Sequence, residues 1–306
     1  MKDSSSGYFE VAPGVYGLKI IFVNIYMVAG ADGQWVLVDA GIMGSAGRIK
    51  KMAEELFGDV PPSAIILTHA HFDHRGALPA LLKTWDVPVY AHNLELPYLR
   101  GLSSYPPPDP TVGGGLMSLL SVLYPKKPLN LGDRVRALPQ DGSVPFLNDW
   151  IYIPTPGHAP GHISLFRGRD KVLIAGDAFV TTKQESAYDA LTFKKVLSGP
   201  PKYFTPDWIS ANDSVIRLRD LHPHVAATGH GVPMQGEELA KGLDHLVNTF
   251  NETAVPAHGR YVHDAAKMNK RGVQYVPPQK VNPVILASAA LITGVLTYTL
   301  IQKIKK

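Results

Sequence analysis

Two kinds of apolar pattern alternate along the first hundred residues of the chain. Short apolar runs are typical of buried strands, whereas Ile49, Met52 and Ala53 recur at the spacing of one helix face. This alternation indicates helices layered on sheets, an α/β architecture. We expect strands over residues 15–28, with an interruption near Asn24, and over 35–39, 63–67 and 87–91, and helices over 46–57 and 77–83.

A second series of strand-like runs follows a segment of different composition. Residues 101–130 contain a proline-rich stretch at 105–110 and three consecutive glycines at 113–115, which break regular structure. We interpret residues 101–130 as an inserted loop with one helix that covers part of the molecule. Beyond it, we expect strands over residues 134–138, 150–154, 162–166, 171–175 and 225–228, and a helix over residues 233–251.

The last part of the chain has a different character. Residues 284–301 carry no charged side chain, and a helix of that length spans about 27 Å, close to the hydrocarbon thickness of a bilayer. We therefore expect a catalytic domain over residues 1–278, a stiff linker over 279–283 and a transmembrane anchor over 284–302. An apolar helix packed in the core is the alternative. Because the N-terminus has no signal peptide, we expect a membrane-associated protein whose catalytic domain is cytoplasmic.

Composition narrows the possible chemistry. The 306 residues are 45% hydrophobic and 18% charged, as in a folded globular protein. The net charge of +4 comes without a long basic run, so nucleic-acid binding is not expected. The sequence has no cysteine, which excludes disulfides, thiolate-bound zinc and thiol catalysis. The 12 histidines are the unusual count, and several of them lie in short, spaced groups.

The segment Thr68-His-Ala-His-Phe-Asp-His74 follows an apolar strand and holds four potential metal ligands. His69 and His71 are two residues apart, so in extended backbone their imidazoles point the same way. Asp73 and His74 follow where the chain turns, and they can face a second point nearby. Imidazole and carboxylate ligands suit zinc, and they tolerate iron or manganese. The segment therefore predicts part of a metal centre.

Further ligands must come from the ends of other strands. His158 and His162 lie in Thr-Pro-Gly-His-Ala-Pro-Gly-His, where proline and glycine forbid a regular helix, so we expect only one of them to bind metal. Asp177 follows the strand expected over 171–175, and His230 follows the strand expected over 225–228. One acid or histidine after a strand is often a turn residue. Several of them at the ends of separate strands indicate a shared centre.

With these residues in view, the chain resembles the metallo-β-lactamase-fold metal-dependent hydrolases over roughly residues 8–260. The family pattern is an early Asp, then His-x-His-x-Asp-His, then His, Asp and His. It matches Asp39, His69, His71, Asp73, His74, His158, Asp177 and His230. The resemblance implies an α/β (α+β) fold with a four-layer αββα sandwich, followed here by the apolar C-terminal helix.

The resemblance also implies a role for each matching residue. His69, His71 and His158 would hold one metal ion, and Asp73, His74 and His230 would hold the other. Asp177 would bridge the two ions, and Asp39 would orient the histidine loop through hydrogen bonds. His162 is expected to be an orienting residue near the site.

Such a centre is chemically suited to hydrolysis. Two divalent ions about 3.5–4 Å apart, zinc or alternatively manganese or iron, share a water and lower its pKa, and the resulting hydroxide attacks a carbonyl or phosphorus. Asp73 is the candidate for proton transfer. We expect a dinuclear metallohydrolase that acts on a small molecule. A non-hydrolytic di-iron redox or binding protein of the same fold is the alternative.

Local features suggest the substrate class. The Thr-Pro-Gly-His segment resembles the glyoxalase II and acyl-homoserine-lactone lactonase groups of the family. Those lactonases carry a tyrosine three residues past the bridging Asp, where this chain has Val180, and no glutathione-binding domain is recognisable. Residues 101–130 and 179–208 are apolar and aromatic, and we expect them to cover the site. These features favour an apolar ester, thioester or lactone, with a phosphodiester as the alternative.

Overall fold

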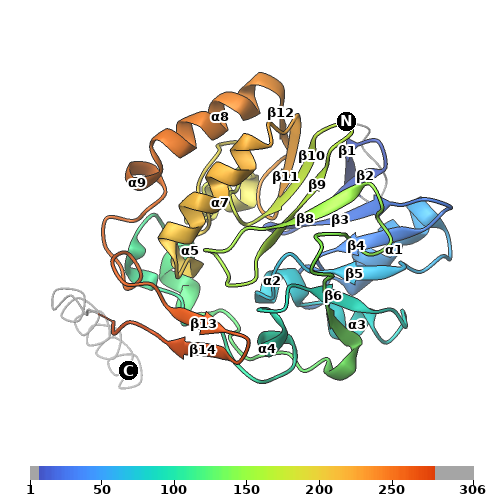
Figure 1. Cartoon of the computed structure of the whole chain (residues 1–306), viewed down its shortest axis with the longest axis horizontal. Helices are drawn as coiled ribbons and strands as arrows, with labels where there is room; N and C mark the ends of the chain where they lie inside the picture. The colour runs from blue at the N-terminus through green and yellow to red at the C-terminus, as the bar shows by residue number, and fades with distance from the viewer. Residues whose placement is uncertain (1–6, 280–306) are drawn as a thin grey trace, which may run out of the picture.

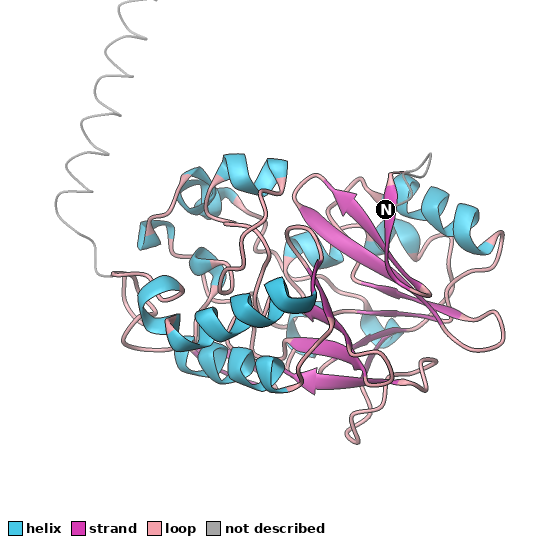
Figure 2. Cartoon of the chain, turned by 90° about the horizontal axis from the view of Figure 1, so that it is seen from above, coloured by secondary structure: helices cyan, strands magenta, loops and turns pink. Residues whose placement is uncertain are grey.

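Two β-sheets form the centre of the protein, and helices lie on both sides of them (Figure 1, Figure 2). The structure is a computed structural model that describes residues 7–279. The first sheet has its strands in the order β1-β2-β3-β4-β5-β6-β7, antiparallel from β1 to β4 and parallel from β4 to β7. These strands are β1 (Tyr8–Ala12), β2 (Val15–Ile20), β3 (Val23–Ala29), β4 (Trp35–Val38), β5 (Ala64–Ile66), β6 (Val89–Ala91) and β7 (Val135–Ala137).

The second sheet has the strand order β12-β11-β10-β9-β8, in which only β10 and β11 are parallel. Its strands are β8 (Trp150–Pro154), β9 (Ile163–Arg167), β10 (Val172–Gly176), β11 (Val225–Thr228) and β12 (Met234–Gln235). A separate pair consists of β13 (Lys267–Asn269) and β14 (Gly272–Tyr275).

The longest helices are α1 (Ala46–Phe57), α7 (Trp208–Asp220) and α8 (Gly236–Asn248). Helix α1 packs on the first sheet, whereas α7 and α8 pack on the second (Figure 1). The shorter helices are α2 (Phe72–Arg75), α3 (Leu78–Leu81), α4 (Leu96–Leu99), α5 (Leu116–Leu120), α6 (Ala187–Thr192) and α9 (Phe250–Thr253). Single 3₁₀ turns are η1 (Pro110–Val112), η2 (Ser121–Leu123), η3 (Gly132–Arg134) and η4 (Lys202–Phe204).

Three apolar clusters hold these layers together. One cluster lies between the sheets, where Val38 and Ile66 of the first meet Leu165 and Ile174 of the second. Another joins the outer face of the first sheet to α1 and α3, and the third joins the second sheet to α7 and α8. Strands buried on both faces read as continuous apolar runs, and this explains why β10 is apolar throughout. The expected mixed α/β fold with several sheets is confirmed.

Helix α1 and strands β8 and β11 have the bounds expected from the sequence, whereas the bounds of the other expected strands differ by one or two residues. Two differences have a local cause. Ile21 has a φ of 57° in the turn between β2 and β3, so the interruption precedes Asn24, which lies inside β3. The helix expected over 233–251 begins only at Gly236, because Met234 and Gln235 pair with β11. Strands β1, β13 and β14 were not among the elements expected from the sequence.

The expected membrane anchor requires a correction. Within residues 7–279, no helix is both long enough and apolar enough to cross a bilayer. Residues 280–283 of the expected linker and the segment 284–302 lie outside the described residues. We therefore withdraw the apolar C-terminal helix, the membrane as a partner and the membrane-associated location, because hydropathy along residues 284–301 was their sole basis.

Helix α7 offers a matched test of the packing on the second sheet. Leu218 is fully buried, whereas Ile209 in the same helix is 78% exposed. We expect Leu218→Ala to lower the free energy of unfolding by about 2–5 kcal/mol, because it removes buried methyl groups and leaves a cavity. Ile209→Ala should change it by less than about 0.5 kcal/mol. Urea denaturation of both variants measures the difference, and equal values would contradict the assigned packing.

Candidate metal centre

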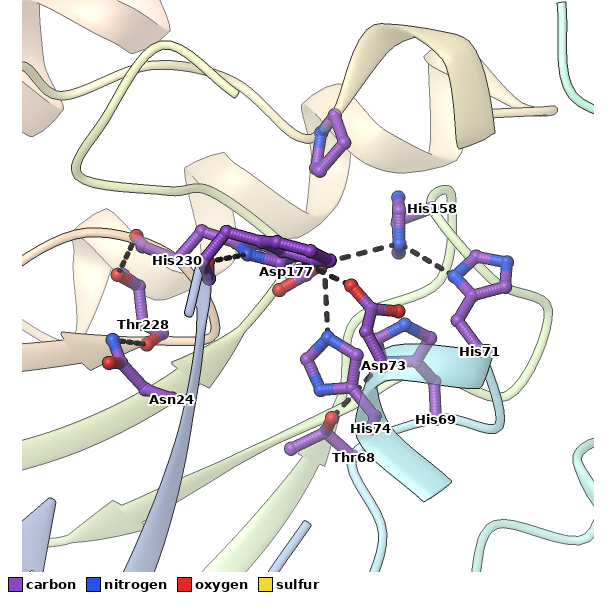
Figure 3. A network of polar contacts seen from close by, with 12 residues as sticks. Asn24, Thr68, His69, His71, Asp73, His74, His158, Asp177, Thr228 and His230 are labelled. Carbon is purple, nitrogen blue, oxygen red and sulfur yellow. Dashed lines mark hydrogen bonds and ion pairs between the residues drawn. The ribbon is translucent and has the colours of Figure 1, made fainter. Parts of the chain in front are cut away.

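Seven histidine and aspartate side chains converge where strands of the two sheets end (Figure 3). His69 and His71 follow β5, and Asp73 and His74 lie in α2. His158 lies in the loop between β8 and β9. The other two ligand candidates, Asp177 and His230, follow β10 and β11. All seven side chains are buried, none more than 6% exposed.

The side chains form three overlapping groups, and the ligand atoms of each group lie within 4.8 Å of one another. Two of the groups match the two metal sites that the sequence resemblance implies, and the third places Asp177 with one histidine of each site. The groups are His69, His71 and His158; Asp73, His74 and His230; and His69, His74 and Asp177. All seven predicted ligand residues are therefore brought together.

Asp177 lies at the centre of the cluster. Its Oδ2 is 3.1 Å from His230 Nε2, 3.4 Å from His158 Nε2 and 3.5 Å from His74 Nε2. Gly229 leaves room for this carboxylate, because a Cβ at that position would lie 2.0 Å from Asp177 Oδ1. The residue after β11 must therefore be glycine for Asp177 to face three imidazoles at once.

Several buried polar atoms in the centre have no hydrogen-bond partner among the described residues. These atoms are His69 Nε2, His74 Nε2 and Asp177 Oδ1. Buried polar atoms without partners are rare, and each one requires an explanation. Imidazole nitrogens and carboxylate oxygens are the ligands that zinc and iron use. The residues present thus fit metal ions in their chemistry as well as in their spacing.

The protonation states of three of the imidazoles suit metal ligation. Burial lowers the pKa of His69 and of His71 well below the usual value, and burial lowers the pKa of His158 to about 3. These imidazoles are therefore neutral near pH 7, as metal ligands must be. Burial would lower the pKa of His74 and of His230 as well, but Asp177 outweighs that effect and raises the pKa of both. Burial would also raise the pKa of Asp177, but His230 and His74 outweigh that effect and hold it well below the usual range.

Asp39 holds the segment 68–74, which carries four of the ligand candidates. Its Oδ1 accepts a hydrogen bond from the Thr68 backbone N–H at 2.8 Å. Its Oδ2 accepts from the Thr68 hydroxyl and lies 2.8 Å from His74 Nδ1. A hydrogen bond to one ring nitrogen directs the other toward the centre, so Asp39 orients His74 Nε2.

His162 lies behind Asp177 and outside the three ligand groups. Its Nε2 accepts a hydrogen bond from the Asp177 backbone N–H at 2.9 Å, and its Nδ1 is 2.8 Å from the Thr155 hydroxyl. Burial lowers the pKa of His162 to about 4, which leaves Nε2 free to accept. Of the two histidines four residues apart, His158 thus faces the centre and His162 holds the backbone of Asp177.

Asn24 is a supporting residue that the sequence analysis did not identify. Its Nδ2 donates to the carbonyl oxygens of Thr228 at 3.0 Å and Gly231 at 2.7 Å, on both sides of His230. The neighbouring Phe22 carbonyl oxygen lies 2.7 Å from His230 Nδ1. The signal that the sequence offered for Asn24 was its polar amide within the otherwise apolar run of β3.

Aromatic side chains line the open side of the centre. Phe204 stacks on His71 with ring centroids 4.6 Å apart, and the Tyr105 ring lies 4.4 Å from the same imidazole. Both rings, with His158, line a small pocket beside the centre. Tyr105 belongs to the expected cover segment 101–130, and Phe204 belongs to the other expected cover segment, residues 179–208. Not every apolar residue of these segments faces the site, since Leu102 is 71% exposed to solvent.

Comparison with known proteins agrees with this geometry. The family profile described as the Metallo-beta-lactamase superfamily matches residues 19–230, which include all seven converging side chains. The Bacillus subtilis protein named Probable metallo-hydrolase YflN is 47% identical over 250 residues, which cover 81% of this chain and 95% of that protein.

Two solved structures show the same fold. TTHA1429, a metallo-beta-lactamase family protein from Thermus thermophilus, has a TM-score of 0.55 at 23% identity, covering 79% of this chain and 81% of that one. TTHA1623, solved in a di-iron-bound form, has a TM-score of 0.50 at 27% identity, covering 76% and 98%. Fold, converging residues and sequence similarity agree, and the chain belongs to the metallo-beta-lactamase superfamily, as a metallo-hydrolase of that family.

Proposed function

We propose that this protein is a dinuclear metallohydrolase. One ion would be held by His69, His71 and His158 and the other by Asp73, His74 and His230, and Asp177 would serve as a ligand to both. The observation that carries the proposal is the pair of histidine-containing groups, each within 4.8 Å, joined by a buried carboxylate. The unpartnered nitrogens of His69 and His74, one from each group, support it.

The division of roles follows from the side chains. Metal ions bound here would supply an activated water and would polarise the bond to be cleaved. Asp73 is the residue we assign to proton transfer, because it is the most exposed of the seven, at 6%, and its Oδ2 lies 3.5 Å from His230 Nε2. Burial raises the pKa of the Asp73 carboxyl above its usual value.

The surroundings of the site favour an apolar acyl substrate. Tyr105 and Phe204 offer aromatic faces directly beside His71, and Pro106 and Pro107 extend the same wall of the small pocket. We therefore infer that the substrate is an ester, thioester or lactone whose apolar group packs on these rings. The pocket wall contains no lysine or arginine, the residues that would pair with the charge of a phosphodiester.

A substrate panel tests the proposed reaction. We expect the zinc-loaded full-length protein to turn over aryl and alkyl acyl esters, thioesters or lactones. Its kcat/KM for these should exceed that for bis(p-nitrophenyl) phosphate by at least about tenfold, a difference of about 1.4 kcal/mol in transition-state binding. Turnover of the phosphodiester alone would instead support the alternative function and would refute the acyl assignment.

Metal content tests the two-ion centre. Mass spectrometry of the full-length protein should find about two zinc ions per chain, and Asp177→Asn should retain at most one, because a neutral amide is a poor bridging ligand. Asp213→Asn, on the exposed surface of α7, is the matched control and should retain both. Two iron atoms together with a redox signal would favour the di-iron alternative. If Asp177→Asn retains both metal ions, as the control does, the role of Asp177 is contradicted.

Asp39 gives a test of ligand orientation. We expect Asp39→Asn to weaken zinc binding at the Asp73, His74 and His230 site by about 10- to 100-fold, because an amide cannot accept from Thr68 and His74 as the carboxylate does. Asp32→Asn is the control: Asp32 is exposed, and like Asp39 it has a positive φ, which asparagine tolerates. Equal zinc affinities in the two variants, measured by chelator competition, would count against the assigned role.

A further inference from the structure

Glu95 is a fully buried acid that the proposed reaction does not use. It lies between β6, a strand of the first sheet, and α4, directly before the first residue of that helix. Burial raises the pKa of Glu95 to about 7, although three hydrogen bonds oppose that effect. Burying a carboxyl group is costly unless hydrogen bonds compensate for the lost water, so its contacts are informative.

The carboxylate of Glu95 joins the two loops that carry His69, His71 and His158, which we call the first group. Its Oε2 accepts a hydrogen bond from the Ala70 backbone N–H at 2.9 Å, and Ala70 lies between His69 and His71. Its Oε1 accepts from the Gly161 backbone N–H at 2.8 Å, three residues after His158. In this arrangement His71 Nδ1 and His158 Nε2 lie 3.0 Å apart.

Two further contacts fix Glu95 in place. A Cβ at position 161 would lie 2.9 Å from Glu95 Cγ and 2.8 Å from His92 Nδ1, so the loop can approach the carboxylate only because residue 161 is glycine. From the other side, the Tyr105 hydroxyl donates to Oε2 and also lies 2.9 Å from the Ala70 nitrogen. Tyr105 therefore links the cover segment to the same carboxylate.

We propose that Glu95 is a positioning residue that holds the loops of His69, His71 and His158 in register and couples the cover segment to them through Tyr105. The inference rests on the proposed metal centre but concerns only one half of it. His74 is instead contacted by Asp39 and His230 by the Phe22 carbonyl, and Asn24 holds the backbone on both sides of His230. The hydrogen bonds of Glu95 go to Ala70, Gly161 and Tyr105. The effect of Glu95 is therefore specific to the first group.

The substitution Glu95→Gln tests the proposal. An amide has one acceptor oxygen, so it can bond to one loop only and sets its N–H₂ against the backbone N–H of the other. Zinc affinity is measured by competition with a chromogenic chelator in two backgrounds. His230→Ala leaves the group His69, His71 and His158, and His71→Ala leaves the group Asp73, His74 and His230. We expect a loss of about 10- to 100-fold in the first background and less than about 3-fold in the second.

The control is Glu185→Gln, a second buried acid, which accepts from the Lys202 backbone N–H at 2.8 Å and not from the backbone of residues 69–74 or 158–162. Its zinc affinity should match that of the unsubstituted protein in both backgrounds. An equal loss in both backgrounds for Glu95→Gln, or no loss in either, overturns the positioning role.

Folding of each variant is monitored by circular dichroism. If Glu95→Gln does not fold, Gly161→Ala tests the same role of Glu95. Its Cβ would displace the Glu95 side chain but leave the carboxyl group in the protein. The same selective loss is then expected, and unchanged affinity overturns the proposal. Failure of the unsubstituted protein to bind zinc would instead refute the proposed function. A full complement of zinc in the unsubstituted protein, retained at full affinity by Glu95→Gln, refutes only the inference about Glu95.

Discussion

The burial of the Asp177 carboxylate among imidazoles is the constraint on which the rest of the structure depends. A carboxylate that is only 2% exposed is costly unless charged or strongly polar groups surround it. Three histidine nitrogens within 3.5 Å meet that need, and they come from separate loops. The two sheets must therefore pack with the ends of β5, β8, β10 and β11 close together, because no single loop carries all of these groups.

Behind the ligand candidates, each supporting polar residue joins segments that are far apart in the sequence. Asp39 links the end of β4 to the histidine loop, and His162 links the start of β9 to Asp177. Asn24 links β3 to the loop of His230, and Glu95 links two ligand loops across the sheets. Fixed orientation of ligands by such contacts is what distinguishes a metal site from a cluster of histidines.

The part of the site that could be predicted from the sequence is the part with a local signal. Four ligand candidates stand within residues 69–74, and Asp177 and His230 follow apolar runs that are strands in the structure. The bounds of α1 were predictable because its buried face repeats with helical spacing. Glu95 has no such signal, and the amide of Asn24 in an apolar strand indicates a polar contact without its partner, since the partners of both lie elsewhere in the chain and become neighbours only through folding.

Apolar composition was the least dependable guide. It indicated that residues 101–130 cover the site, and Tyr105 does lie beside His71, but Leu119 and Leu123 of the same segment are 62% and 74% exposed. Ser118 and Ser121, two polar residues of α5 and η2, are buried there instead. Hydropathy along a sequence does not say which face of a short helix turns inward when the segment packs on aromatic neighbours instead of a sheet. The membrane anchor inferred in the same way had to be withdrawn.

The hydrogen bonds of Asn24 also bear on how the protein is made. They join β3 to residues more than 200 positions later in the chain, at Thr228 and Gly231. A ribosome therefore synthesises all the strands of the first sheet, and the segment with His69, His71, Asp73 and His74, long before the segment that carries His230. Such distant pairings form slowly, since a long loop must close before they contribute. Until His230 is synthesised, the group Asp73, His74 and His230 lacks one of its members.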